Sequence, residues 1–272
     1  MEVPEGSAER WTLPTLPAAV DWCSRKNREG IRCILDVLGE YTADTRQIAE
    51  TERMYHACIE AIRSTGIEAS VTLKLTALGV SDNPDHARSV THDLARECAK
   101  ANLGFEIDME SRGLVDITLD IAHSCLQEGY PVTVALQAYL RRTPADLHAL
   151  LSAGGRPRIV KGAYFGDSDD DPVIRSWFRA LVDMAVAGGR SFSLGTHDPD
   201  LIAWVTKAHA DAQQRIELSF LKGLADTTKQ RLAQSGWRVA EYVPFGVHTA
   251  PYIARRERYL RDLGRRGVQP VP

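Results

Sequence analysis

Short apolar runs recur along the chain, and each is followed by a polar residue and then by a segment with helical spacing. Runs of this length, bounded by turn residues, are typical of buried strands. We predict eight strands, at Ile31–Leu38, Val71–Leu75, Phe105–Met109, Val132–Gln137, Arg158–Lys161, Ser191–Gly195, Ile216–Phe220 and Val239–Pro244. Between the first two, Ile48, Tyr55 and Ile62 share one face of a helix.

Helix start signals support the same alternation. Thr143-Pro144 and Asp198-Pro199 each place a capping residue before a proline at the first helical position. Eight alternations of strand and helix favour an α/β fold of the (βα)8 barrel type. The competing doubly wound open sheet lacks support, because no GxGxxG follows any predicted strand. We expect one barrel domain, residues 31–272, preceded by a short helical cap, residues 1–30, with Trp11 and Trp22.

Composition narrows the class of protein. The chain has 272 residues, of which 44% are hydrophobic and 25% charged, with a formal net charge of -3. This balance is globular and predicts no broad basic surface for nucleic acid. Five cysteines without a CxxC pair indicate reduced thiols and a cytoplasmic location. We find no secretory signal and no apolar run of roughly 18 residues, so we expect no membrane span.

Polar side chains stand where the predicted strands end. The carboxyl ends of barrel strands meet at one mouth, so these side chains converge there. They are Glu40, Lys74, Asp108, Glu110, Gln137, Lys161, Tyr164, Thr196, His197, Asp198, Lys222 and Tyr242. Any one of them alone could be a turn residue or a solvated charge. Several cations at one mouth, however, predict an anionic ligand.

The last predicted helix, which begins near Thr249, carries a second polar feature. Tyr252, Arg255, Arg256 and Tyr259 lie on one face of this helix. A helix that seals a barrel normally buries apolar residues there. Paired arginines suit a carboxylate, because a guanidinium binds it in a two-pronged arrangement.

Nine stretches, in order, resemble the proline dehydrogenase (proline oxidase) family of flavoenzymes, in its short monofunctional bacterial type. They are LDVLGEY (35–41), VTLKLTALG (71–79), IDMESR (107–112), ALQAYLRRT (135–143), RIVKGAY (158–164), THD (196–198), FLKG (220–223), YVPFG (242–246) and PYIARR (251–256). The resemblance spans roughly residues 31–260, and VKGAY and the YVPFG…RR spacing are its most specific signals.

The resemblance implies a fold, a cofactor and a reaction. The fold would be a distorted (βα)8 barrel with its last helix over the mouth, holding FAD noncovalently. L-Proline would be oxidised to Δ1-pyrroline-5-carboxylate by hydride transfer to the flavin, and a quinone would accept the electrons. Loose peripheral contact with the inner face of a membrane would follow from the lipid solubility of quinones. The oligomeric state stays open.

The same resemblance assigns roles to individual residues. The substrate carboxylate would pair with Arg255 and Arg256, assisted by Lys74, while Tyr164, Tyr242 and Leu221 shape the pocket and Asp108 holds Tyr242 or its neighbours. Arg158, near the flavin N5 atom, and Gln137 would approach the isoalloxazine. The remaining cofactor contacts would come from Val160, Lys161, Gly162, Thr196, His197 and Asp198. No metal site is predicted, since HxH and HExxH are absent and Asp169–Asp171 have no nearby His.

Some positions depart from the family pattern and keep alternatives open. Tyr259 stands where a glutamate is usual, Ser219 replaces a common glutamine, and the loop after VKGAY is acidic. A flavin-dependent dehydrogenase of another cyclic or secondary amino acid is one alternative, although the retained Tyr242 favours unsubstituted proline. A lyase with a Schiff base on Lys74 or Lys161 is another. A degenerate barrel that binds without turnover is the last.

Overall fold

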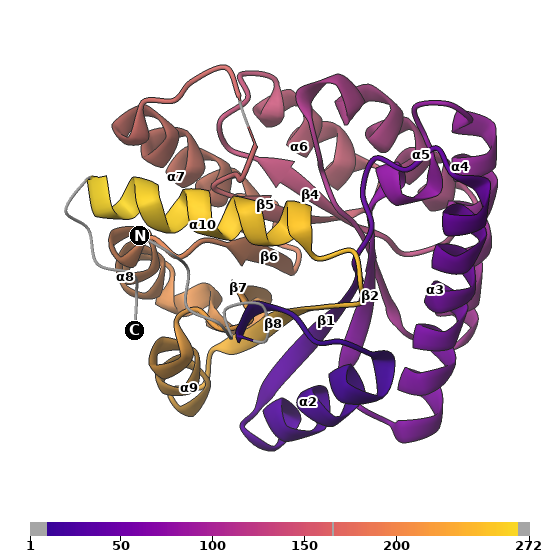
Figure 1. Ribbon diagram of the computed structural model, residues 1–272. Coiled ribbons are helices and arrows are strands. Elements are labelled where there is room, and N and C mark those ends of the chain that lie inside the picture. The colour runs from indigo at the N-terminus through magenta and orange to yellow at the C-terminus, as the bar shows by residue number, and fades with distance from the viewer. Residues whose placement is uncertain (1–9, 165, 266–272) are drawn as a thin grey trace.

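Eight parallel strands close into a barrel in which each strand pairs with its neighbours in chain order (Figure 1). The computed structural model describes residues 10–164 and 166–265, with side chains described up to residue 261. The strands are β1 (Ile31–Val37), β2 (Ala69–Leu73), β3 (Gly104–Ile107), β4 (Thr133–Gln137), β5 (Arg156–Val160), β6 (Phe192–Gly195), β7 (Ile216–Leu221) and β8 (Arg238–Phe245). The predicted (βα)8 class is confirmed, and the predicted strand ends differ from these by at most two residues.

Helices follow the strands around the outside of the barrel. They are α3 (Thr45–Thr65), α4 (Pro84–Lys100), α5 (Val115–Gln127), α6 (Thr143–Ser152), α7 (Asp171–Ala187), α8 (Pro199–Ala208) and α9 (Asp226–Gln234), with short 3-10 turns at Leu75–Leu78, Arg112–Leu114 and Ala210–Arg215. Among the described residues, no helix has the length and apolar character that a bilayer crossing needs.

The two predicted helix starts have different outcomes. Asp198 caps α8 as expected, since its carboxylate accepts from the backbone N–H groups of Asp200 and Leu201. The prediction that Thr143 caps α6 is wrong. Thr143 is the first helical residue, and its hydroxyl donates to the carbonyl of Gln137 at 2.6 Å. The hydroxyl is therefore used to tie α6 back to the end of β4.

The first and last helices depart from a regular barrel. α2 (Leu16–Arg28) packs on the outside of β1 and β8, where the helix after β8 would ordinarily lie. α10 (Ala250–Arg265) instead crosses the carboxyl ends of the strands (Figure 1). Leu13 holds the leading segment in place, exchanging backbone hydrogen bonds with Pro244 and Gly246. The division into a cap, residues 1–30, and a barrel stays a proposal, and residues 1–9 lie outside the described residues.

Charged side chains fill much of the barrel interior, where branched apolar residues usually lie. We call Asp36, Lys74, Asp108 and Tyr242 the mouth cluster, and Arg32, Glu106, Arg156 and Glu217 the floor cluster. Arg158 contacts a member of each, Asp108 and Glu106. Buried ions are tolerated only when they are paired. Each charged group in the barrel interior therefore needs an oppositely charged neighbour within ion-pair distance.

Candidate active site

The mouth cluster forms around the ammonium group of Lys74, which lies just after β2 and is 4% exposed. Its Nζ donates to Asp36 Oδ1 and to the Tyr242 hydroxyl, both at 2.6 Å. The Tyr242 hydroxyl in turn donates to Asp108 Oδ2 at 2.5 Å, and Lys74 lies 3.1 Å from the same oxygen. Residues in or just after four strands, β1, β2, β3 and β8, thus gather two carboxylates and a phenol around one cation.

Ionisation in this cluster is set by burial and by the paired charges. Burial alone would lower the pKa of Lys74, but Asp36, Tyr242 and Asp108 raise it well above its ordinary value. Burial would raise the pKa of Asp108, yet Lys74 and Arg158 lower it to about 2. For Asp36, burial prevails over Lys74 and raises the pKa to about 6. Asp108 is therefore the permanently anionic member.

Arg158 lies beside this cluster on β5, with a side chain that is 4% exposed. It donates to Asp108 Oδ1, and its Nη1 lies 3.2 Å from Glu106 Oε2. The guanidinium carbon is 5.7 Å from the centre of the Tyr242 ring. Burial opposes its charge, but Asp108 and Glu106 raise the pKa of Arg158, so the group remains a cation.

The two arginines of α10 occupy different environments. Arg255 pairs through both terminal nitrogens with the carboxylate of Glu40, the residue that follows β1 by three positions, and lies 5.3 Å from the Tyr164 ring. Arg256 is 7% exposed and stacks on Tyr252, with 5.1 Å between its guanidinium carbon and the ring centre. Its Nε is buried, with no hydrogen-bond partner among the described residues.

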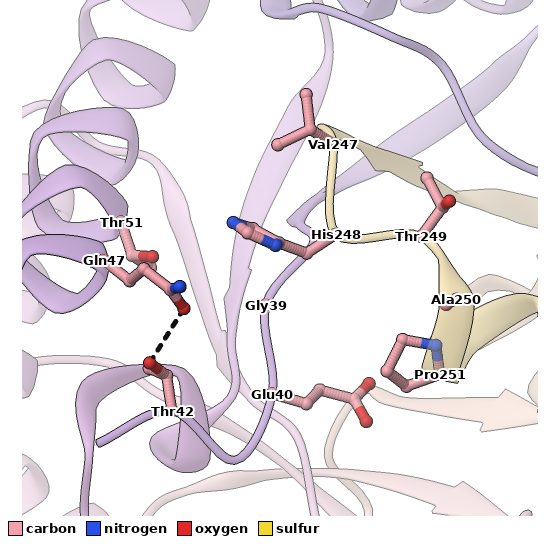
Figure 2. Close-up of a pocket in the computed structure, with 10 residues that line it drawn as sticks. All are labelled: Gly39, Glu40, Thr42, Gln47, Thr51, Val247, His248, Thr249, Ala250 and Pro251. Atoms are coloured by element: carbon pink, nitrogen blue, oxygen red, sulfur yellow. Dashed lines mark hydrogen bonds between the residues drawn. The ribbon is translucent and has the colours of Figure 1, made fainter. Parts of the chain in front are cut away.

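A cavity of about 310 Å³ lies on the other side of Glu40. Figure 2 shows it between the segment after β1, including Gly39 and Glu40, and the approach to α10, including His248 and Pro251. A hydrogen bond between Thr42 and Gln47 lies along its edge. Glu40 therefore belongs both to the wall of this cavity and to the ion pair with Arg255.

Residues predicted to bind a cofactor gather at the ends of β4, β5 and β6. Gln137 donates through Nε2 to the carbonyls of Met109 and Glu110, which leaves its buried Oε1 without a partner among the described residues. Lys161 pairs with Asp171 at 2.6 Å and with Asp198 at 2.7 Å. Among the described residues, these two ion pairs use two of the three N–H donors of the Lys161 ammonium group, so one donor is left for a ligand.

The remaining predicted cofactor residues flank this group. Val160 lies opposite Gln137 and Gly195 in the strand register, and the Thr196 hydroxyl accepts from the backbone N–H of Asp198 at 3.1 Å. His197 Nε2 accepts from the backbone N–H of Leu221 at 3.0 Å, so the predicted cofactor side and the predicted pocket wall adjoin. Burial and the charges of Arg256 and Lys229 lower the pKa of His197 to about 3, which keeps the ring neutral.

Gly162 has a specific steric role after β5. Its φ is +118°, and a Cβ there would overlap the ring of Tyr139. The Tyr139 hydroxyl accepts from the backbone N–H of Tyr164 at 3.2 Å, and its carbonyl accepts from Asp167 N–H. Tyr139 thus fixes the path of the VKGAY loop, a role that the sequence does not predict.

Several buried polar atoms face the mouth without a hydrogen-bond partner among the described residues. They belong to Trp11, Asp36, Gln137, Ser219, Tyr252 and Arg256. Burying a polar atom without a partner is costly, and a bound group that supplied the missing partners would reduce that cost. Trp11, Asp36 and Tyr252 were not predicted as site residues. Two of the three could have been found from the sequence. Asp36 is a charged residue inside the apolar run of β1, and Tyr252 lies on the same helix face as the paired arginines.

The geometry defines a class of protein: a (βα)8 barrel with paired charges buried in its interior and its last helix across the mouth. The family model described as proline dehydrogenase matches residues 19–258. This chain belongs to the proline dehydrogenase family and is therefore an oxidoreductase by family.

Individual relatives agree with this assignment. The chain is 28% identical to "Proline dehydrogenase 1" of Bacillus subtilis (strain 168), over 89% of this chain and 82% of that protein. It is 29% identical to "Proline dehydrogenase" of Deinococcus radiodurans, over 92% of this chain and 84% of the relative. Its fold is similar to proline utilization A from Bdellovibrio bacteriovorus, with a TM-score of 0.85 at 16% identity. That match covers 92% of this chain and 32% of the much longer protein.

Proposed function

We propose that this protein is an FAD-dependent L-proline dehydrogenase that forms Δ1-pyrroline-5-carboxylate. The observation that carries the proposal is the contact of Lys74, Asp108 and Tyr242 beneath the arginines of α10, in a chain of the proline dehydrogenase family. These groups offer cations for a carboxylate and an enclosed, partly aromatic wall for a small ring. Family membership supports proline as the compound that fits there.

The residues present are compatible with a bound flavin. The unpartnered Gln137 Oε1 can accept a hydrogen bond from a ring N–H, and Arg158 supplies a fixed cation nearby. Val160, Lys161, Gly162, Thr196, His197 and Asp198 would hold the remainder of the cofactor. When bound, FAD would supply the hydride acceptor that no amino-acid side chain provides.

The protein's own residues would bind and orient the substrate. Arg255 and Arg256 would hold its carboxylate, with Lys74 below, while Tyr164, Tyr242 and Leu221 enclose its ring. Since Arg255 already pairs with Glu40, the substrate carboxylate would compete with Glu40 for that guanidinium. Asp108 keeps the Tyr242 hydroxyl oriented by accepting a hydrogen bond from it. The substrate amine must be deprotonated first, because its lone pair forms the C=N bond as the carbon next to nitrogen loses a hydride.

An absorption spectrum of the purified protein, before and after L-proline is added, tests the proposal. We expect a flavin spectrum that bleaches with proline and returns when a soluble quinone is added. Asp108→Asn is the matched variant, because it keeps the shape of the side chain but removes the anion that holds Tyr242. It should retain flavin colour and bleach more slowly. A colourless protein that is indifferent to added FAD would contradict the proposal.

Tyr259 motivates a second candidate, a flavin-dependent dehydrogenase of another cyclic or secondary amino acid. Its ring lies 6.0 Å from the His197 ring, at the position where the family resemblance implies a glutamate. Turnover of proline, hydroxyproline, pipecolate and acyclic N-substituted amino acids distinguishes the two candidates. A preference for any compound other than proline would replace the first proposal with the second. Quinone as electron acceptor and peripheral membrane contact remain parts of the proposal that the quinone assay and vesicle binding would test.

A further inference from the structure

Glu106 has contacts that the proposed chemistry does not use. It lies on β3 two residues before Asp108, is 2% exposed, and faces the barrel interior. Its Oε1 accepts from the Ser70 hydroxyl at 2.5 Å and lies 3.3 Å from Arg32. Its Oε2 has no hydrogen-bond partner among the described residues. The cation that pairs with this oxygen is Arg158, whose Nη1 lies 3.2 Å away.

Arg158 is therefore held between two carboxylates, Glu106 on β3 and Asp108 directly after it. It reaches β3 across β4, where Ala135 is its neighbour in the register. The small side chain of Ala135 leaves room for this crossing. Asp108, above, is shared with Lys74 and Tyr242, so it cannot balance Arg158 alone. Glu106, below, pairs with Ser70 and Arg32 through Oε1, and its Oε2 is the oxygen that lies 3.2 Å from Arg158.

The surrounding charges make this balance specific. Arg158 and the two clusters contain four cations, Arg32, Lys74, Arg156 and Arg158, and four carboxylates, Asp36, Asp108, Glu106 and Glu217. Removing one carboxylate leaves an excess positive charge whose location depends on which carboxylate is lost. At Glu106 the excess falls on Arg158 and on Arg32, whereas at Glu217 it falls on Arg32 and Arg156 and leaves the contacts of Arg158 in place.

We infer that Glu106 is a positioning residue that fixes the guanidinium of Arg158 and sets the net charge it presents to the bound cofactor. The part that concerns the cofactor rests on the proposed function. The part that concerns Arg158 does not. Neutralising Glu106 would leave Arg158 held by Asp108 alone, and would make its surroundings more positive.

The test uses the full chain with Glu106→Gln, which keeps the shape of the side chain and removes its charge. Glu217→Gln is the matched control, because it removes one buried carboxylate that does not contact Arg158. Glu106→Asp retains the charge at greater distance and serves if the glutamine variant does not fold. The first readout is hydrogen exchange of the Arg158 guanidinium by nitrogen-15 NMR, assigned with Arg158→Lys. It needs no cofactor.

We expect exchange at Arg158 to become roughly tenfold faster in Glu106→Gln, with a smaller increase in Glu106→Asp, because a charge pair in this low-dielectric interior is strong. In Glu217→Gln the rate should stay near that of the parent protein. An unchanged rate in Glu106→Gln, or an equal increase in Glu217→Gln, would overturn the inference.

The second readout is the reduction potential of bound flavin. A more positive site favours the reduced, anionic ring, so Glu106→Gln should raise the potential. A tenfold change in the equilibrium constant corresponds to about 30 mV for a two-electron couple. A potential unchanged from the parent protein would refute the charge-setting role. If the parent protein binds no flavin, the proposed function fails, and the exchange measurement still decides whether Glu106 positions Arg158.

Discussion

The mouth and the floor of the barrel interior are both lined with buried charge, but they satisfy it differently. On the floor, Glu217 accepts two hydrogen bonds from Arg32, each at 2.9 Å, and one from Ser193 at 3.0 Å. Burial would raise the pKa of Glu217, yet Arg32 and its other partners lower it to about 2. At the mouth, Glu110 has only the hydroxyl and N–H of Thr76 as hydrogen-bond donors among the described residues. Burial raises the pKa of Glu110 to about 7.

The difference indicates where a ligand belongs. A floor in which cations and carboxylates neutralise one another is a structural element, since buried ions need partners from the same chain. The floor also has two buried atoms without hydrogen-bond partners among the described residues, Glu106 Oε2 and Arg156 Nε, but both belong to ion-paired groups. At the mouth, the neutral Gln137 Oε1 has no partner either, and Gln137 lies against Glu110, a carboxylate that is not fully ionised. Incomplete pairing is costly for the protein alone and becomes favourable when a ligand supplies the missing partners.

The largest expected effect is on the floor. Glu217→Ala leaves Arg32 and Arg156 without their shared carboxylate, and breaking a buried pair in this way costs about 3–5 kcal/mol of unfolding free energy. Arg238→Ala is the control, because Arg238 is 41% exposed and lies 3.9 Å from the same carboxylate; exposed pairs contribute about 0–1 kcal/mol. Urea unfolding measures both. Equal, small losses of unfolding free energy in the two variants would show that the buried ion pairs of the floor do not stabilise the fold.

The next effect is a pH dependence at the mouth. Below the usual pKa of 4.5, Glu110 is neutral in the folded and unfolded states. As the pH rises towards 7 the unfolded chain ionises first, so folding stability falls, by up to about 3 kcal/mol. Glu110→Gln cannot ionise and should remove this fall, becoming more stable than the parent protein at pH 8.

Urea unfolding of both proteins from pH 4 to pH 8 checks this expectation. Their difference in stability should be small at pH 4 and grow with pH. A difference that is independent of pH would mean that Glu110 is ionised throughout, and the proposed contrast with Glu217 would be lost.

The smallest effect is expected on ligand binding. Arg255→Met and Arg256→Met should each weaken binding of proline by about 1.5–3 kcal/mol, the range for a hydrogen bond to a charged group. Flavin colour should persist, because neither residue is assigned to the cofactor. Arg255→Met also leaves Glu40 without its cation, so Arg255→Met combined with Glu40→Gln should recover stability without recovering affinity. Titration of the flavin spectrum measures affinity. Unchanged affinity in both single variants would remove the two arginines from the carboxylate site.

Sequence periodicity located all eight strands, because burial on both faces of a parallel strand leaves a continuous apolar run. Most of the candidate residues could also be identified from the sequence, because polar residues that directly follow an apolar run are easy to recognise. The sequence did not show which charges pair. Lys161 reads as a ligand-binding cation, and in the fold it is paired with Asp171 and Asp198. Glu106 reads as an ordinary strand residue, and in the fold it supports Arg158.

The sequence by itself therefore determined the order of elements, the barrel class and the family motifs, since these depend on local patterns of apolar and polar residues. The family resemblance also implied that the last helix lies over the mouth and that Asp108 lies beside Tyr242. Tertiary structure alone decided that α2 takes the outer place beside β8 and that Asp36 joins Lys74, Asp108 and Tyr242 in one cluster. The physical reason is that barrel closure brings strands together whose separation in the sequence exceeds any local period. The interaction of two buried charges depends on their distance and on the water excluded around them, and neither quantity exists until the barrel has closed.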